Sequence, residues 1–567
     1  MSKGQTRQFS EVFKNVVTGR RNAIVGGENN SIIENTISAT ITGGNSNTIS
    51  NSRYSSILGG YSNEIAGDYS TTLGGNKNRI SSDYSSIIGG KSNLTTGQGS
   101  VIVSGVSNSA VGAHALVLGG ERNFAGGEFA SVLNGYGNNA LGKHAMVSTG
   151  SLNSAKGDFS FIATGGGGTC GYWRGHFICN LISRNVAEGK YSTILGGYSN
   201  NATGTHASII SGSSNTAPGY AAVVVGGGGS GIILPGYEHA SLGNSAVGSH
   251  SVVVGGMENR SYGNYSAILS GGNNETHGRG SAVCGGGGII LDIGDEQFYN
   301  PGNIGYGDFS LVAGGEHNRA GKYYKDENYV FHSTGDNAVA VGGKDNGAYA
   351  PRSCAVGGRG NSITYGEMGS TLGGAWNQVS GQLSVIVGGQ NNVSAGYATL
   401  VSGGMHNWAF DYVSAIFGGL FNVAGVPING NFPFKLYNID TDILSDRAGM
   451  TTVGGYRNRA FDNISTVVGG TRNVAGHVPQ NEDYCVQCSS CFSLAPVTVH
   501  DNGPLVSIIP HDCSCLQECY TSNMTTSAAT ITGGNDNHLA SYLQNGLYYP
   551  WIAGYGFEYS YLGSGSK

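Results

Sequence analysis

A glycine pair followed three residues later by an asparagine returns along this chain at a fixed spacing. The second glycine of the pair is found at Gly60, Gly75, Gly90, Gly105, Gly120, Gly135 and Gly150. Each step is 15 residues (75 − 60 = 15), and the same register resumes at Gly197 and again at Gly374. A fixed period of this length indicates a solenoid, in which every repeat forms one coil that stacks on the next.

Within each repeat, the residues separate into columns that predict two short strands. The column of Ser55 and the column of Ile57 are two positions apart, so a strand would point both toward one face. A second strand follows the asparagine and carries the column of Ile65. We therefore predict an all-β fold: a parallel β-roll or β-solenoid with coils of about 15 residues, two tight turns per coil, and a thin interior.

Glycine and asparagine mark the predicted turns. We expect both residue types at positions that need a positive φ, because they adopt it most readily. The stacked amides of the asparagine column would also form a hydrogen-bonded turn ladder along the roll. The members of this predicted ladder in the first coils are Asn63, Asn78, Asn93, Asn108, Asn123 and Asn138.

An aliphatic column lies between the interior columns, and strand alternation places it on the outside. Its members are Leu58, Leu73, Ile88, Val103, Leu118 and Leu133. A single soluble roll would expose this column as a long apolar stripe, which monomers avoid. We therefore expect rolls to associate side by side through it. The alternative at this stage is a flatter roll that holds the column inside. An aromatic and histidine column that includes Tyr54 and His114 runs beside it.

The repeat resembles the head repeat of the YadA-like trimeric autotransporter adhesins. The segments NFAGGEFASVLNG (Asn123 to Gly135) and NNALGKHAMVSTG (Asn138 to Gly150) carry the resemblance, which covers about two thirds of the chain. It implies a left-handed roll and a homotrimer. Unlike those adhesins, the sequence shows no leader, coiled-coil stalk or C-terminal barrel anchor, and it has more paired glycines and larger aliphatic residues. Viral and phage surface fibres, which reuse such rolls, fit these departures better.

Composition and charge exclude several classes of protein. Gly accounts for 99 of 567 residues, but it does not recur every third residue as in collagen. With 39% hydrophobic residues the chain is not a disordered, charge-rich polymer. A net charge of −6 argues against a nucleic-acid partner, whose binding protein would be basic. The longest apolar run, Ala221 to Leu234, is too short and too rich in glycine for insertion into a membrane.

Non-repeat segments interrupt the roll and divide the chain. We expect a docking tail for other virion structural proteins (residues 1–22, with a helical stripe from Phe9 to Val16), a regular roll (23–165), a roll with inserted loops (166–455), further coils (456–478), a Cys-rich insertion (479–529), and a last coil with an aromatic cap (530–567). Insertions at one register would share one face, often the binding face. Tyr172, Trp173 and Phe177 form one candidate partner-binding loop; the alternative is a tolerated surface loop.

The cysteines suggest staples in the insertions. Cys170 and Cys179 flank one loop, whereas Cys284 and Cys354 are expected to be ordinary buried thiols. A dense group lies in the insertion at 479–529, and disulfides or zinc would both stabilise a segment without its own core. We favour disulfides. The members of this group are Cys485, Cys488, Cys491, Cys513, Cys515 and Cys519.

No catalytic, cofactor or metal motif is complete, so we expect a non-enzymatic protein without a cofactor. Asp68 and Asp83 lie one coil apart, at a separation that a retaining glycosidase would use, but their column continues with Gln98 and Ala113. Our leading hypothesis is a homotrimeric virion surface fibre or minor structural protein that binds host or other structural proteins, including a surface receptor or glycan. The alternatives are a polysaccharide-degrading solenoid like a phage tailspike, and an extracellular or cell-surface adhesin or matrix protein.

Overall fold

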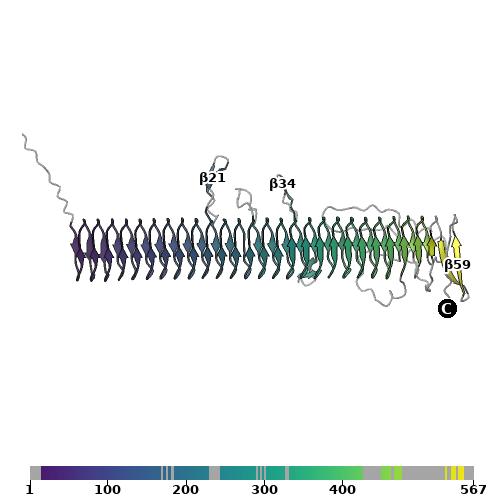
Figure 1. Cartoon of the computed structure of the whole chain (residues 1–567), viewed down its shortest axis with the longest axis horizontal. Coiled ribbons are helices and arrows are strands. Elements are labelled where there is room, and N and C mark those ends of the chain that lie inside the picture. Colours follow the sequence, from purple (N-terminus) through teal and green to yellow (C-terminus); the bar gives the residue numbers. More distant parts are fainter. Residues whose placement is uncertain are drawn as a thin grey trace, which may run out of the picture. The chain divides into compact units, whose positions relative to one another are not determined.

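The computed structural model describes residues 14–167, 170–173, 176–179, 184–228, 243–288, 291–293, 296–298, 302–325, 331–425, 449–460, 465–475, 530–532, 538–544 and 547–553. The fold over these ranges is all-β, because every regular element in them is a strand. Consequently the described ranges contain no helix that could span a membrane. Parallel strands stack in coils of about 15 residues, which makes the protein a β-solenoid as the repeat predicts (Figure 1). The chain divides into two compact units, Met1–Ser270 and Gly271–Lys567.

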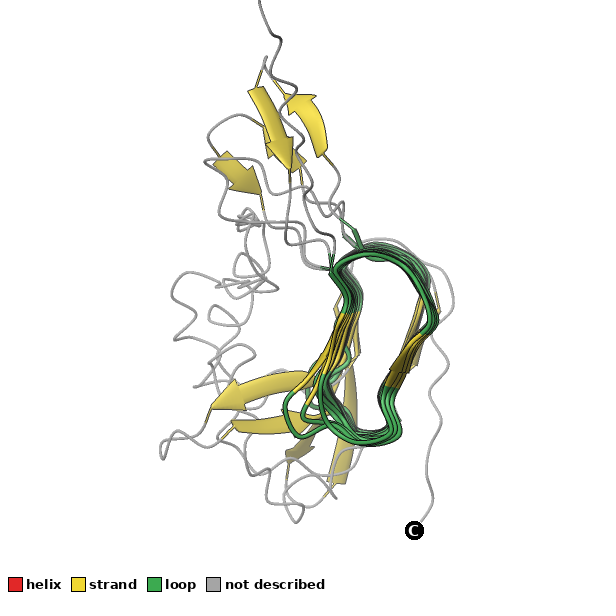
Figure 2. Cartoon of the chain, turned by 90° about the vertical axis from the view of Figure 1, so that its left-hand side faces the viewer, coloured by secondary structure: helices red, strands yellow, loops and turns green. Residues whose placement is uncertain are grey.

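The coil that contains Leu58 shows the plan of the first unit. Strand β6 (Ser56–Ile57) belongs to one sheet, here called sheet two, and strand β7 (Glu64–Ile65) belongs to sheet one. Residues 59–62 connect them through what we call the glycine corner, and residues 67–69 lead back to sheet two through the return corner. Figure 2 shows this cross-section, with one strand segment on each side and loops between them.

Each strand pairs in parallel with the strand one coil away. The register places Ser56 opposite Thr71 in sheet two and Glu64 opposite Arg79 in sheet one. Ladder bonds such as Leu58 N–H to Thr72 O, 3.0 Å, join the coils. The inward residue of most described strands is fully buried, as Ile57 is, whereas its strand neighbour is usually half-buried, as Ser56 is. The core is therefore one narrow double row of Ile, Val, Ala, Ser and Thr side chains.

Two lists give the strands of the first unit. Sheet one contains β1 (Val16–Val17), β3 (Ser31–Ile33), β5 (Thr48–Ser50), β7, β9 (Arg79–Ile80), β11 (Leu94–Thr95), β13 (Ser109–Ala110), β15 (Phe124–Ala125), β17 (Asn139–Ala140), β19 (Ser154–Ala155), β23 (Val186–Ala187), β25 (Asn201–Ala202), β28 (Ser245–Ala246) and β30 (Arg260–Ser261). Sheet two contains β2 (Ala23–Ile24), β4 (Thr40–Ile41), β6, β8 (Thr71–Thr72), β10 (Ser86–Ile87), β12 (Val101–Ile102), β14 (Leu116–Val117), β16 (Ser131–Val132), β18 (Met146–Val147), β20 (Phe161–Ile162), β24 (Thr193–Ile194), β26 (Ser208–Ile209), β27 (Val223–Val224), β29 (Val252–Val253) and β31 (Ala267–Ile268).

The second unit has the same plan with longer strands in sheet two. Its sheet one contains β32 (Glu275–Thr276), β36 (Ile304–Gly305), β38 (Arg319–Ala320), β42 (Gly347–Ala348), β44 (Ser362–Ile363), β46 (Gln378–Val379), β48 (Val393–Ser394), β50 (Trp408–Ala409), β52 (Val423–Ala424), β54 (Arg459–Ala460), β56 (Val474–Ala475), β58 (His538–Gln544) and β59 (Leu547–Ala553). Its sheet two contains β33 (Ala282–Cys284), β37 (Leu311–Ala313), β41 (Val339–Val341), β43 (Cys354–Val356), β45 (Ser370–Leu372), β47 (Val385–Val387), β49 (Leu400–Ser402), β51 (Ala415–Phe417), β53 (Thr451–Val453), β55 (Thr466–Val468) and β57 (Thr530–Thr532).

The two ends of the coil stack differ from the sequence expectation in one respect. Val16, the last member of the expected helical stripe, lies in β1 and pairs with Ser31, so the helix is wrong at this residue and the stacking starts before residue 23. At the other end, β58 and β59 form an antiparallel hairpin that extends sheet one. Pro550 in β59 cannot donate a ladder hydrogen bond, which suits a terminal strand. Residues 1–13 of the expected docking tail, and the residues after β57 that are not in β58 or β59, lie outside the described ranges.

Candidate functional site

The outer face of sheet two carries the aliphatic column as an exposed surface. Leu58, Leu73 and Ile88 are 48%, 46% and 44% exposed, while their neighbour Ile57 is 0% exposed. The flatter roll that would bury this column is therefore wrong for the single chain. Leu118 is also exposed, and Val103 and Leu133 are half-buried. We call this set and its equivalents in later coils the Leu58 column.

The same face is free of charge along the described coils of both units. Its second column contains the first residue of each sheet-two strand, for example Ser56 and Thr71, and we call it the Ser56 column. Neither column contains Asp, Glu, Lys or Arg at any described coil. In the second unit the Leu58 column continues with exposed side chains at Leu372, Val387 and Phe417. An uncharged apolar stripe of this extent marks an interaction surface.

Two cysteines belong to this face rather than to the interior. Cys284 is in the Leu58 column and Cys354 is in the Ser56 column, and both are half-exposed and free. The expectation of ordinary buried thiols is therefore wrong. Both cysteines are at strand positions whose side chains point away from the interior. Partial desolvation raises the pKa of the Cys354 thiol, so it stays protonated at neutral pH.

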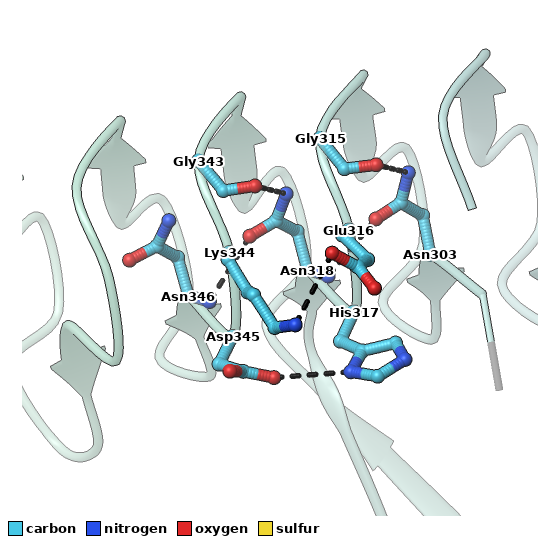
Figure 3. Close-up of polar contacts among 9 residues, drawn as sticks. All are labelled: Asn303, Gly315, Glu316, His317, Asn318, Gly343, Lys344, Asp345 and Asn346. Atoms are coloured by element: carbon cyan, nitrogen blue, oxygen red, sulfur yellow. Dashed lines mark hydrogen bonds and ion pairs between the residues drawn. The ribbon is translucent and has the colours of Figure 1, made fainter. Parts of the chain in front are cut away.

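The asparagine column forms the expected hydrogen-bonded ladder, in which amide-to-amide bonds such as Asn63 Nδ2 to Asn47 Oδ1, 3.1 Å, are joined by a larger number of bonds to the backbone. Asn63 is fully buried, and its Oδ1 accepts the backbone N–H of Asn78 at 3.0 Å. Its Nδ2 donates to the carbonyl oxygens of Gly59 and Gly75, at 3.2 and 3.1 Å. Each amide thus satisfies backbone groups of two coils and closes the glycine corner. The same pattern recurs at Asn303 and Asn318 in the second unit (Figure 3).

The expected positive φ at asparagine is wrong, because it falls one residue earlier. Ser62, Lys77 and Ser92 have φ near +56°, whereas no residue of the Asn63 column between Asn63 and Asn153 does. The second glycine does adopt it, with φ of +98° at Gly60. Asparagine is at its position because its side chain forms hydrogen bonds to the backbone of two coils. The residue before it adopts the positive φ.

The aromatic column runs along the return corner of the first unit as a stack of rings. Phe129 lies between His114 and His144, with ring centroids 4.9 and 4.8 Å apart and nearly parallel planes. Tyr69 lies in the same way between Tyr54 and Tyr84. Since each inner ring has both faces covered by its neighbours, only ring edges remain exposed. The stack therefore joins coils, and it is interrupted at Gly99, which has no ring, and at Tyr220, which meets His206 and His250 edge to face.

Inserted segments leave the roll at the ends of sheet-one strands. Those at 168–183, 229–242 and 289–301 interrupt the glycine corner just before the asparagine column, at one shared register as expected. Those at 322–334, 426–448 and 476–529 leave instead at the return corner, after β38, β52 and β56. The expectation of a single face therefore needs correction. Both groups nevertheless border sheet one along the chain, either just before or just after one of its strands.

Three insertions contain short antiparallel hairpins. They are β21 (Cys170–Trp173) with β22 (His176–Cys179), β34 (Leu291–Ile293) with β35 (Glu296–Phe298), and β39 (Lys322–Lys325) with β40 (Phe331–Thr334). The first places Cys170 opposite Cys179 and Tyr172 opposite Phe177 along the backbone. The side chains of these residues and of Trp173 lie outside the described part. So does the whole group from Cys485 to Cys519.

The glycine runs that precede three insertions have a steric cause. A Cβ on Gly166 would overlap the carbonyl oxygen of Ser151, and one on Gly287 would overlap that of Gly272. Both glycines also have positive φ, +68° and +126°. The chain leaves the roll through a passage that only a residue without a side chain can line.

Charged residues pair between neighbouring coils, including coils that an insertion separates in sequence. Lys344 Nζ lies 3.2 Å from Glu316 Oε2, and His317 Nδ1 lies 3.1 Å from Asp345 Oδ1 (Figure 3). Both pairs join the coils on either side of the hairpin at 322–334. The exposed Lys344–Glu316 pair contributes little energy, but its opposite charges help to align the two coils.

The carboxylates considered for catalysis have a structural use. Asp83 Oδ1 accepts the backbone N–H of Asp68 at 2.8 Å, and Asp68 Oδ1 accepts that of Arg53 at 2.7 Å. Each carboxylate thus caps the return corner of the preceding coil. Within the described ranges, no group of three or more His, Cys, Asp or Glu side chains is arranged to hold a metal ion.

One apolar cluster was missed from the sequence. Trp408 is 6% exposed and packs with Val393 and Val423, with Phe410 and Ala395 at its border. These residues occupy the outward columns of sheet one in the second unit, where the first unit carries mostly polar residues such as Glu64 and single apolar ones such as Phe124. The signal was available as three successive large apolar residues, because the described coils of the first unit have no such run in this column.

Comparison with known proteins identifies no relative. No protein-family model matches the chain. No curated protein sequence matches it either. The resemblance to the adhesin head repeat therefore remains an expectation from the sequence.

Proposed function

We propose that this protein is a non-enzymatic structural protein whose chains associate side by side as a homotrimer through the outer face of sheet two. In this proposal it serves as a virion surface fibre or minor structural protein, and its inserted segments mediate attachment to host or to other structural proteins. The observation that carries the proposal is the uncharged face formed by the Ser56 and Leu58 columns, which a single chain leaves exposed.

The placement of the insertions supports the same assignment. Six inserted segments border sheet one, three of them just before a sheet-one strand and three just after one. A face that is covered by another chain must stay clear of such segments, whereas a face that meets solvent or a partner tolerates them. Sheet two therefore has the properties of the buried side of an assembly, and sheet one those of its display side.

Burial of the Leu58 column provides the driving force. Removing apolar surface from water contributes about 25 cal/mol per Å². Leu58, Leu73 and Ile88 each leave between two fifths and half of their surface in water in the single chain. Because such a residue recurs at nearly every coil, many modest contributions add along each unit. Association also needs no charged group to lose its water, a cost that disfavours many interfaces.

No specific observation favours either alternative function. A polysaccharide-degrading solenoid needs two carboxylates free to act on a glycosidic bond, whereas Asp68 and Asp83 both accept backbone hydrogen bonds. A cell-surface adhesin would use the same roll and the same interface. It differs in location, and detection of the protein in purified particles rather than on cells distinguishes the two.

The test is the molar mass of the purified chain in solution, measured by light scattering. We expect about three times 58.2 kDa for the parent protein. The double variant Leu73→Asp/Leu118→Asp should lower the mass to that of one chain, because it places charges in the interface. The control variant Ser81→Asp/Thr96→Asp puts the same charges on the outer face of sheet one and should keep the trimer. A monomeric parent protein would overturn the proposal, and a dimer would correct its stoichiometry.

A further inference from the structure

The two columns of the sheet-two face vary in size in opposite directions. Two large residues share a coil at Leu116/Leu118, and two small ones do at Thr40/Thr42 and Ala282/Cys284, but in every other described coil with a large residue in the Leu58 column the Ser56 column has a small one. The pairs of this kind are Ser56/Leu58, Thr71/Leu73, Ser86/Ile88, Ser131/Leu133, Thr193/Leu195, Ser208/Ile210, Ala267/Leu269, Ser370/Leu372 and Ala415/Phe417. The reverse order is found at Met146/Ser148, Phe161/Ala163, Leu311/Ala313 and Leu400/Ser402, and two valines are found at 101/103, 223/225, 252/254, 339/341 and 385/387.

The chain alone does not impose this compensation. Two large residues are tolerated at these positions, because Leu116 and Leu118 are in one coil, both pointing outward. The outer face of sheet one also holds large neighbours together, as at Arg260/Tyr262 and Trp408/Phe410. Water adapts to any surface shape, so a solvent-exposed face has no reason to hold the summed size nearly constant. A close-packed interface does, because both voids and excess volume destabilise it.

The partner surface must repeat at the same interval as the coils. A nearly constant side-chain volume per coil, maintained in both units, fits a partner that offers one slot of fixed size per coil. Neighbouring strands are about 4.8 Å apart, and another stack of such coils has that spacing. The uncharged character of both columns further requires an apolar partner. A second copy of this chain meets both conditions.

We propose that the Ser56 column packs against the Leu58 column of a second copy of this chain, which is parallel and in register. The inference rests on the proposed self-association and adds its geometry. At coils with one large and one small residue, the large residue from one copy fills the space that the small residue of the other leaves, and at coils with two valines the two fill it equally. A shift by one coil would bring Phe161 of one copy against Leu195 of the other, where both are large, so the alternation also sets the register.

Exchanging the residues at positions 161 and 163 of one coil tests whether the two columns fill one common packing space. Phe161→Ala creates a void, and Ala163→Phe adds volume to a filled slot. The double variant Phe161→Ala/Ala163→Phe restores the sum and reproduces the order seen at Ala415/Phe417. We expect the dissociation constant of the assembly to rise by roughly 100-fold for the first variant and by roughly tenfold for the second. The double variant should return to within roughly tenfold of the parent protein, so the two effects are strongly non-additive.

The outcomes separate this inference from the proposed function. If the parent protein is monomeric, self-association itself fails. If it associates but the double variant loses as much as the two single variants together, the columns do not share a slot and the inference is overturned. Far-UV circular dichroism of each variant checks that the roll still forms. It should, because neither side chain contributes to the interior.

Thiol cross-linking tests direction and register independently. Chains with Thr71→Cys and chains with Leu73→Cys, assembled together, place thiols in the two facing columns of one coil, and Ser81→Cys places one on the outer face of sheet one as a control. With a copper–phenanthroline oxidant, we expect the thiol at position 71 of one copy to form a disulfide with the thiol at position 73 of another, which mass spectrometry identifies. The control should give no such product. An assembly that forms without this cross-link would overturn the parallel, in-register arrangement.

Discussion

The glycine corner has two conformations, one in each unit of the chain. In the first unit the leading glycine of each pair, such as Gly59 or Gly74, has an ordinary φ, and only the second glycine is positive. In the second unit both are positive, as at Gly373 (+75°) and Gly374 (+78°). The sequence changes accordingly. The leading position holds Ser104, Asn134 and Thr149 in the first unit but only glycine in the described coils of the second.

Hydrogen bonding explains the change. In the first unit the N–H of the leading residue donates toward the next coil, for example from Asn134 to Ser148 O at 3.0 Å. In the second unit it donates toward the previous coil, from Gly357 to Val341 O at 2.7 Å. The reversal lengthens the sheet-two strand to three residues, as β43 compared with β10 shows. A left-handed backbone costs a residue with a side chain about 1–2 kcal/mol, so this corner selects glycine.

The second glycine is what the two corners share, and its replacement should have the largest effect. A Cβ on Gly75 or Gly374 would overlap a glycine carbonyl oxygen of the next coil and the Asn78 or Asn377 amide of the ladder. We expect Gly75→Ala and Gly374→Ala each to lower the free energy of unfolding by more than about 2 kcal/mol. Equilibrium unfolding in denaturant measures this loss. Equal losses in the two units would agree with a shared role, whereas a loss in only one would contradict it.

The sequence predicts the repeated part of this architecture because alternation is a property of any strand. Ile57 and Ile65 had to face one way and Leu58 the other, and the structure places them so. The corners were harder to predict. Nothing in the composition of Ser62, Lys77 and Ser92 signals a left-handed backbone, so the positive φ was assigned to the neighbouring asparagine, whose side chain is instead fully used for hydrogen bonds.

Other features were visible in the sequence but were not interpreted. The unbroken run of leading glycines in the second unit indicates a change of turn, yet glycine pairs were treated as equivalent along the chain. The inverse relation between side-chain sizes in the Ser56 and Leu58 columns can also be read from the sequence, once it is known which residues of each strand point outward. Which insertions leave at which corner depends on the alignment of irregular coils, and the structure was needed to place those after β38, β52 and β56.

Replacement of the leading glycine should separate the two corners. Neither Gly74 nor Gly373 has an atom within 4 Å of an added Cβ, so the two sites differ chiefly in φ. We expect Gly373→Ala to cost about 1–2 kcal/mol of unfolding free energy. Gly74→Ala should be neutral, or stabilising by about 0.5 kcal/mol through the less flexible unfolded chain. Hydrogen exchange of the amides in the affected coil localises each effect, and equal costs at the two sites would contradict the two-conformation description.

The return corner offers a smaller contrast between the units. In the first unit Phe129 stacks on His114 and His144, whereas the equivalent position in the second unit holds aliphatic residues such as Leu383. Aromatic pairs contribute about 0.5–1.5 kcal/mol beyond their burial. We therefore expect Phe129→Ala to destabilise its coil by about 1 kcal/mol more than Leu383→Ala does. Both side chains are about 40% exposed, which makes the comparison a measure of ring stacking. Similar losses would show that the stack adds nothing.

The smallest expected effects depend on pH and have opposite signs in the two units. Both involve the residue before the asparagine, Glu258 in the first unit and His406 in the second, each with a positive φ. Burial raises the pKa of Glu258 against the opposing charge of Arg260, and burial lowers the pKa of His406, which stacks on Phe421 at 4.8 Å. In both cases the folded chain disfavours the charged form.

Linkage gives the direction of each effect. The unfolded chain binds a proton at His406 before the folded chain does, so stability should fall as the pH drops below about 6.5 and level off below the lowered pKa. For Glu258 the folded chain keeps its proton longer, so the contribution is present at low pH and is lost as the pH rises from about 4.3 through the raised pKa. Urea unfolding across this pH range, repeated with His406→Phe and Glu258→Gln, should remove one slope each. If either variant leaves the pH profile unchanged, burial at that corner does not control the charge.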